Sequence, residues 1–221
     1  MNRDFLARIA LPTKALTLLA ALFCVLTPVS SFGQQMQSKA TSLESANAVE
    51  SFSRSLDYLK KALTEQASRI EEQAVAIDKA GPTESQKGLI KEVKLIVRST
   101  VDQISVTLDS SVQACEFANS NIDRLASSKE IKNSELEEIL RLWTKLREDC
   151  VEAQTRLRAA RAELEALLAL IQGQENAIKE YLQLKAFSNA AKVAQQLVGE
   201  TRSAFARISD EVYKTKIPGI S

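Results

Sequence analysis

Histidine is absent from the 221 residues of this chain, and its absence removes much of the usual chemistry of enzymes. A chain without imidazole has no His-dependent catalytic triad, no imidazole metal ligand and no histidine general base. Cysteine is also scarce, because three residues are too few for a four-thiolate zinc site. We therefore expect no metal-binding residue in this protein.

Glycine is nearly as scarce, and the six glycines are scattered rather than gathered in a phosphate-binding loop. No acidic run has the spacing of a calcium loop. The adjacent carboxylates Glu71-Glu72 and Glu137-Glu138 are candidates for acid–base chemistry, but neighbouring residues on a helix point in different directions. We interpret them as solvated helix flanks. We expect no catalytic residue, no cofactor and no enzyme activity.

Proline and aromatic residues are few as well, with four prolines and 5% aromatics. The residues that dominate instead are Ala, Leu, Glu, Lys, Arg, Gln and Ser, most of which favour helices. Charged residues make up 26% of the chain, a normal share for a folded protein. The composition predicts an all-α protein.

The N-terminus has the three parts of a secretory signal. A positively charged leader, 1–14, precedes an apolar run at 15–26, and small residues follow Pro28. The apolar run is shorter than the roughly 20 residues needed to cross a bilayer. We expect cleavage after Gly33, with Ser31 as the second choice. An uncleaved membrane anchor is the alternative.

Cleavage at this position changes the charge and fixes the expected location. Lys plus Arg falls from 29 to 26 and Asp plus Glu from 28 to 27, which leaves a net charge of −1. That balance argues against binding to nucleic acid. We expect an exported protein, periplasmic if bacterial or otherwise secreted, with no membrane span after cleavage.

Breaks in the helical pattern divide the chain. We expect a signal peptide at 1–33, a flexible segment at 34–41, a helical bundle at 42–214 and a flexible tail at 215–221. Within the bundle, Gly81-Pro82 is the clearest break, 127–134 is the second, and 172–174 around Gly173 is the weakest. These breaks predict four long antiparallel helices. Three helices, the last running from Ser134 to Lys214, are the alternative.

Apolar residues recur at intervals of three, four and seven in every segment, as expected of helices that bury one stripe. In 83–126 the stripe consists of Ile90, Val93, Val97, Val101, Ile104, Leu108, Val112, Cys115, Ala118, Ile122 and Leu125. In 134–171 it consists of Leu136, Ile139, Trp143, Leu146, Cys150, Ala153, Leu157, Ala160, Leu164, Leu167 and Ile171. We expect both stripes to face the core, with Trp143 packed there rather than binding a ligand.

Two glutamines interrupt the stripe of the first segment, which otherwise runs from Val49 to Ile77. Gln66 and Gln73 stand where the heptad calls for apolar residues. Polar residues at such positions weaken packing and can specify register or partner. A partly exposed stretch is an equally good interpretation.

The cysteines that remain after cleavage, Cys115 and Cys150, lie on the inward stripes of consecutive segments. In an antiparallel hairpin, facing residues have a constant sum of positions. The midpoint of this pair falls near Asn133, inside the expected loop, so the two thiols should lie at the same height. We predict a disulfide between them, as suits an exported chain. A redox-active pair is the alternative, but such pairs usually stand closer in sequence.

These features favour a non-enzymatic protein that acts through protein–protein contacts. An envelope scaffold, an adaptor or an accessory part of secretion or surface machinery all fit, with an unknown protein partner or self-association. The alternative is a four-helix bundle that binds a small apolar ligand in a slot lined by Ala186, Ala190 and Ala194.

Overall fold

A computed structural model describes residues 31–79, 84–127 and 134–216, with side chains described at 47–79, 86–127, 134 and 136–216. The chain divides into two units, Met1–Ser38 and Lys39–Ser221. The described part of the first unit, 31–38, is helical. The expected signal peptide lies outside the described residues up to position 30.

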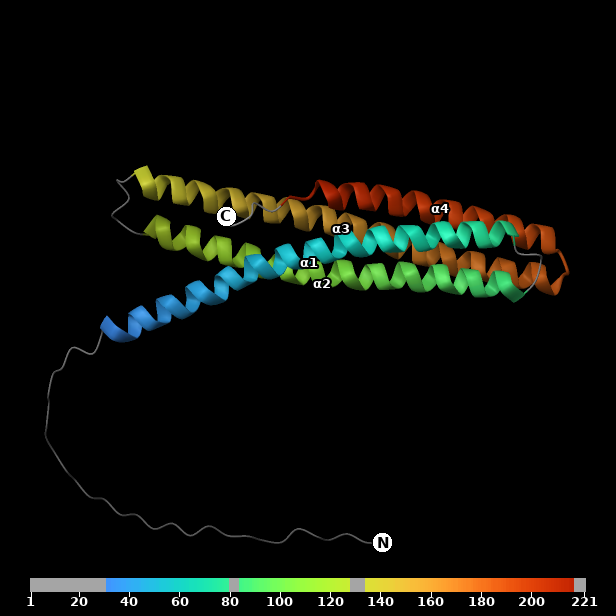
Figure 1. Ribbon diagram of the computed structural model, residues 1–221, viewed down its shortest axis with the longest axis horizontal. Helices are drawn as coiled ribbons and strands as arrows, with labels where there is room; N and C mark the ends of the chain where they lie inside the picture. The colour runs from blue at the N-terminus through green and yellow to red at the C-terminus, as the bar shows by residue number, and fades with distance from the viewer. Residues whose placement is uncertain (1–30, 80–83, 128–133, 217–221) are drawn as a thin grey trace, which may run out of the picture. The chain divides into compact units, whose positions relative to one another are not determined.

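The described residues form an all-α bundle of four helices and contain no strand (Figure 1). The helices are α1 (Ser31–Lys79), α2 (Glu84–Ser127), α3 (Ser134–Gln183) and α4 (Phe187–Lys214). The fold class expected from the sequence is confirmed.

Contacts between helices show that each runs antiparallel to the next. Ser55 on α1 meets Ser110 on α2 at 3.2 Å, whereas Arg69, further along α1, pairs with Glu92, which comes earlier on α2. In the same way α4 lies along both α3 and α1. Arg207 on α4 pairs with Glu163 on α3, and Arg202 pairs with Glu71 on α1 at 2.9 Å. The four helices therefore enclose one shared core.

The core is formed by the apolar stripes, because burying each large aliphatic side chain contributes about 1.5–3 kcal/mol relative to leaving it in water. Every helix contributes fully enclosed residues. The largest are Phe52, Leu59, Leu63, Ile70, Ile90, Ile96, Ile104, Leu157, Leu164, Ile171, Ile178 and Phe205.

The stripe of α2 departs from expectation at one position. Val112 is 38% exposed, and Ser111 is buried in its place. Spacings of four, three and four residues from Ile104 through Leu108 and Ser111 to Cys115 stay closer to the 3.6-residue turn. The Ser111 hydroxyl donates to the Leu108 carbonyl at 2.6 Å, so its burial leaves no unpaired donor. Helical periodicity, rather than side-chain polarity, decides which residue faces inward here.

The turn expected near Gly173 does not occur, because α3 continues through this glycine to Gln183. A Cβ built on Gly173 would meet nothing within 4 Å, so no close packing explains this glycine. A lone glycine costs a helix only about 1 kcal/mol relative to alanine. The segment 175–183 therefore belongs to α3, and the alternative of one helix from Ser134 to Lys214 is also wrong.

The chain turns instead between α3 and α4, where Lys185 has a positive φ of 56°. The Ala186 amide donates to the Tyr181 carbonyl at 2.7 Å, and the Lys185 amide donates to the Leu182 carbonyl at 3.2 Å. These two bonds and the left-handed residue make a Schellman motif, which satisfies carbonyls at the end of a helix. Glycine usually occupies the left-handed position. Because lysine rarely adopts this conformation, the sequence does not predict that the helix ends here.

Two boundaries also differ from expectation. Helix α1 begins at Ser31 rather than near Ser42, so it includes the segment 34–41 that we expected to be flexible. That segment contains no glycine or proline to stop a helix. At the other end, Thr215 is 3% exposed and belongs to the packed bundle. Residues 217–221 of the expected tail lie outside the described part of the chain.

The two glutamines on the stripe of α1 have different surroundings. Gln66 is buried at 8% exposure, and its Oε1 accepts from Arg69 at 3.3 Å. Gln73 is half-buried, and its Oε1 is enclosed without a hydrogen-bond partner among the described residues. These positions are core positions with a polar occupant, so the interpretation as an exposed stretch does not hold for Gln66.

Candidate interaction surface and cysteine pair

The described residues hold little that could perform chemistry. They contain no group of three or more His, Cys, Asp or Glu side chains placed to bind a metal ion. None of the described helices is both long enough and apolar enough to span a membrane. Glu71 and Glu72 are exposed, as are Glu137 and Glu138. Each pair lies on a helix flank, in agreement with the sequence interpretation.

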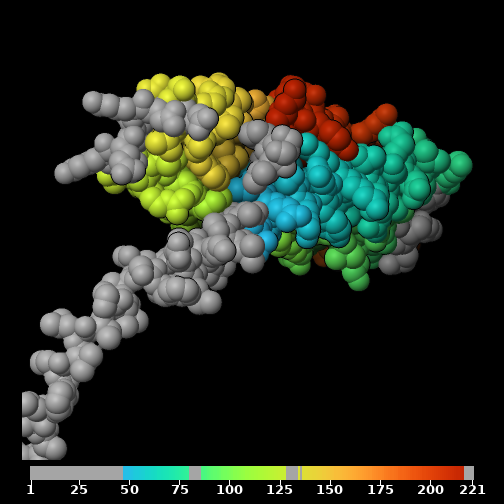
Figure 2. Space-filling model, turned by 60° about the vertical axis from the view of Figure 1, so that its left-hand side comes forward, coloured from blue at the N-terminus to red at the C-terminus, as the bar shows by residue number. Residues whose placement is uncertain are grey.

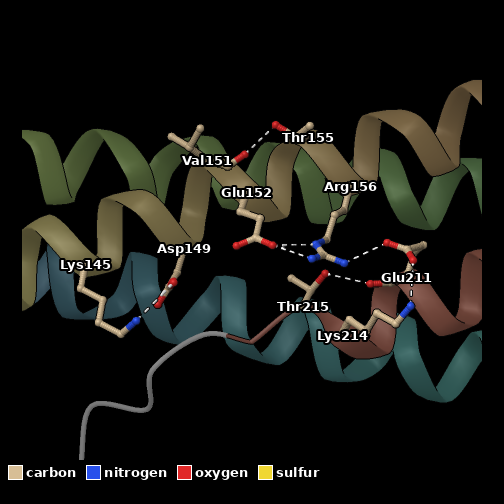
Figure 3. A network of polar contacts seen from close by, with 9 residues as sticks. All are labelled: Lys145, Asp149, Val151, Glu152, Thr155, Arg156, Glu211, Lys214 and Thr215. Carbon is tan, nitrogen blue, oxygen red and sulfur yellow. Dashed lines mark hydrogen bonds and ion pairs between the residues drawn. The ribbon is translucent and has the colours of Figure 1, made fainter.

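The end of α4 is held by a polar network on α3 (Figure 3). Arg156 bridges two carboxylates, with Nη2 at 2.5 Å from Glu152 and Nη1 at 2.8 Å from Glu211. Glu211 in turn accepts from Lys214 at 3.0 Å. Hydrogen bonds to Glu152 first, and then the charge of Glu211, raise the pKa of Arg156. The network fixes the last turn of α4 at the height of Arg156.

Helix α1 holds the same end of α4 from its other side. Lys60 donates to the Thr215 carbonyl at 3.2 Å, and Tyr213 donates to the Lys60 carbonyl at 3.1 Å. The hydroxyls of Tyr213 and Thr64 meet at 2.7 Å. A cation beside the last carbonyls of a helix also complements its dipole. Helix α4 therefore ends in a defined place, between Lys60 on α1 and Arg156 on α3.

Helices α2 and α3 extend beyond this place as a hairpin. We define the hairpin end as residues 117–127 of α2 and 134–146 of α3. Figure 2 shows these ends, in lime and yellow, standing beyond the red α4. Phe117 and Trp143 join them through an edge-to-face contact, with ring centroids 4.9 Å apart and planes at 80°. Trp143 thus packs within the hairpin, as expected, although it remains half-buried.

The hairpin end exposes apolar residues that belong to the stripe of α3. On one heptad position, Ala153 and Ala160 have 0% and 4% exposure and Leu146 has 6%, but Ile139 has 41%. Leu142, which stands beside this stripe, is 54% exposed. Because the repeat itself is unbroken, the change reflects the missing fourth helix. The apolar surface continues where α4 has stopped.

Other apolar residues of the hairpin end are half-buried. They are Phe117, Ile122, Leu125, Leu136, Leu140 and Trp143. No residue of α2 after Asn121 and no described residue of α3 before Leu146 is fully buried. Beyond Asn121 and Leu146, the hairpin end is therefore a pair of helices whose described apolar side chains are half-buried or exposed.

The cysteine pair lies at the border between the hairpin end and the rest of the bundle. Cys115 and Cys150 are buried, with 7% and 1% exposure, and both are free thiols in the structure. Their side chains lie against one another, close enough for the Cys150 thiol to donate a hydrogen bond to the Cys115 sulfur. Gln154 also donates to the Cys115 sulfur at 3.1 Å. The heights predicted from the sequence therefore agree with the structure, whereas the disulfide itself stays a prediction.

The contact makes the two thiols unequal. The hydrogen bond from Cys150 lowers the pKa of Cys115, and the positive charge of Arg158 and the hydrogen bond from Gln154 act in the same direction. Burial opposes this effect. Donating that hydrogen bond raises the pKa of Cys150, as do burial and the charge of Asp149. Cys115 is thus the sulfur that ionises first.

The three alanines expected to line a ligand slot have different surroundings, because Ala186 is half-buried and the other two are buried. Ala190 and Ala194 have no exposed surface, and Ala186 lies in the turn before α4. Such small side chains let neighbouring helices approach closely. The hollows on the surface have other linings; one lies between α1 and α2, where Tyr58 and Val106 project at its rim.

Comparison with known proteins gives no further guide. The chain matches no protein-family model, and it matches none of the curated proteins or solved structures against which it was compared.

Proposed function

We propose that this protein is an exported, non-enzymatic binding protein whose hairpin end binds an amphipathic helix of a partner protein. The observation that carries the proposal is the 41% exposure of Ile139, on a heptad position that is buried at Ala153, Ala160 and Leu167. Export is supported by the N-terminal pattern of charge and apolar residues.

The kind of partner follows from what covers the same stripe elsewhere in the molecule. Along the rest of α3 the covering element is α4, whose stripe contains Leu197, Phe205 and Ile208. An interface that continues in the same direction has room for the same kind of element. At 1.5 Å per residue, the part of α3 in the hairpin end, from Ser134 to Leu146, offers a partner helix roughly 18 Å of surface.

Charged residues beside the surface favour a partner with charges of both signs. Arg156 and Glu163 on α3 already bind Glu211 and Arg207 of α4 across the covered part of the interface. In the uncovered part, Lys145 has a side chain that is 59% exposed and stands 3.8 Å from Asp149. A partner helix with an acidic residue near Lys145 would repeat the pattern. Such flanking charges select partner and register more than they add affinity.

Site-specific photo-crosslinking in the native cell tests the proposal. The photo-reactive residue is placed at Leu142, or at Val151 as the control. Both are exposed apolar residues of α3, at 54% and 53%, but nine intervening steps of 100° put them on opposite faces. We expect Leu142 to crosslink to one protein through a peptide with apolar residues spaced three and four apart.

A binding measurement completes this test, because capture of a protein does not establish the site. The crosslinked peptide should bind the purified protein, and Leu142→Ser should weaken binding at least about tenfold while Val151→Ser leaves it unchanged. Crosslinks from Leu142 to a second copy of this chain alone would show self-association instead. Equal products from both positions, or none from Leu142, would contradict a binding site at the hairpin end.

A further inference from the structure

The position of the thiol pair in the bundle gives it a specific mechanical role. Cys150 stands between Asp149 and Ala153, which both line the hollow where α4 ends at Thr215. Cys115 lies opposite on α2. At positions between the cysteines and the α3–α4 turn, α4 covers the α2–α3 pair. In the hairpin end, beyond the cysteines, it does not. A crosslink at this level would join the two helices where they lose that support.

We propose that Cys115 and Cys150 form a disulfide that staples α2 to α3 at the base of the hairpin end. The two side chains are neighbours in a buried place, and their helices are fixed there by the packing of Ala114, Ala118 and Ala153, all with 0% exposure. Gln154, one turn beyond Cys150 on α3, donates to the Cys115 sulfur at 3.1 Å, so Cys115 lies against the part of α3 that carries Cys150. The staple serves the proposed binding surface but does not depend on it.

The chemistry is a two-electron oxidation by a disulfide of the thiol–disulfide oxidoreductase class. The Cys115 thiolate attacks one sulfur of that disulfide and releases the other as a thiolate, which forms a mixed disulfide. Cys150 then loses its proton and attacks the Cys115 sulfur, which releases the second thiolate of the oxidant. Two electrons reduce the oxidant to a dithiol, and the two protons of Cys115 and Cys150 pass to the released thiolates.

The unequal surroundings of the thiols set this order. Both residues are buried, but Cys115 is less enclosed than Cys150, at 7% exposure against 1%. The hydrogen bond from Cys150 and the charge of Arg158 lower the pKa of Cys115. Cys150 is enclosed, and its pKa is raised. The thiol with the lowered pKa supplies the attacking thiolate, and the more enclosed thiol resolves the intermediate from within the bundle.

Thiol counting on the full-length gene product, recovered from its native cells without reductant, tests the staple directly. After denaturation, an alkylating reagent should label neither Cys115 nor Cys150, and a non-reduced digest should contain their peptides joined. Reduction should restore both labels and add the mass of two hydrogen atoms. Free thiols at both positions, or a disulfide to another protein, would overturn the proposal.

Thermal unfolding measures what the staple does. We expect reduction to lower the unfolding midpoint by about 10 °C, as estimated for a closed loop of this size in a bundle of this size. The double variant Cys115→Ala, Cys150→Ala should not respond to reductant. An oxidised protein with the midpoint of its reduced form would contradict the mechanical role.

Single variants test the order of attack. With glutathione disulfide as oxidant, Cys150→Ser leaves Cys115 to form a stable mixed disulfide, and Cys115→Ser leaves Cys150. Cys115 should react at least about tenfold faster. A faster reaction at Cys150 would reverse the assignment. None of these measurements involves the partner, so failure of the staple and failure of the proposed function are separate results.

Discussion

The two ends of α3 carry the same heptad and have different surroundings. Toward its C-terminus, Ala153, Ala160 and Leu167 have 0%, 4% and 6% exposure, because they face the core of the bundle. Toward its N-terminus, Ile139, on the same heptad position, is 41% exposed. The difference shows that a repeat determines which face of a helix is apolar. The length of the neighbouring helices determines which part of that face is covered.

The length of α4 is therefore the feature that separates the two ends. Helix α4 has 28 residues, whereas α3 has 50. Contacts of Lys60 and Arg156 with Thr215 and Glu211 hold its last turn in place. A helix that merely frayed would have no such contacts at its end. The uncovered surface follows from how the bundle is built, which supports its assignment to binding.

Truncation of one leucine at each end should give the largest contrast. Leu157→Ala leaves a cavity in a fully enclosed site, so we expect the free energy of unfolding to fall by about 3 kcal/mol. Leu142→Ala removes a side chain that is 54% exposed, and we expect a change below about 0.5 kcal/mol. Urea unfolding followed by circular dichroism measures both values. A similar loss for both variants would mean that the hairpin end is enclosed in solution.

The turn at the C-terminal end of α3 provides a smaller contrast. Gly173 lies within the helix with free space around it, so Gly173→Ala should stabilise the protein by about 0.5–1 kcal/mol. Lys185 has a positive φ, and Lys185→Gly should relieve a strain of similar size. Gly199→Ala, in the middle of α4 and also without close neighbours, is the control for helix propensity. Destabilisation by Gly173→Ala alone would place the turn at Gly173 after all.

These positions also show what the sequence could and could not reveal. The loop between α2 and α3 fixes which residues of the two antiparallel helices lie opposite each other. The sequence therefore predicted that Cys115 and Cys150 are neighbours. The turn at Lys185 was missed because its left-handed residue is not glycine, and the loose pattern there favoured Gly173. The inward place of Ser111 was missed because Val112 is more apolar.

The uncovered end of α3 lay beyond sequence reasoning for another reason. Ile139 belongs to a regular heptad, and nothing in that repeat states that α4 stops before reaching it. With the turn expected at Gly173, α4 would have begun earlier and been longer. The candidate surface thus depends on a helix boundary that a single lysine in a left-handed conformation sets.

Two ion pairs give the smallest contrast between the ends. Glu175, at the covered end, binds Lys94 of α2 at 3.2 Å, and hydrogen bonds from Lys94 and then Lys179 lower its pKa. A pKa below the unfolded value means that the pair stabilises the fold above about pH 4.3 and loses this effect as pH falls through the folded value. Glu175→Gln should therefore cost about 0.5 kcal/mol in urea titrations at neutral pH and nothing at about pH 3.

Glu138→Gln is the matched variant at the uncovered end, where the exposed pair with Arg141 lies within α3 alone. We expect no resolvable change for it at either pH, because that pair joins no second helix. An equal effect of both variants would show that the bridge to α2 adds nothing beyond local charge.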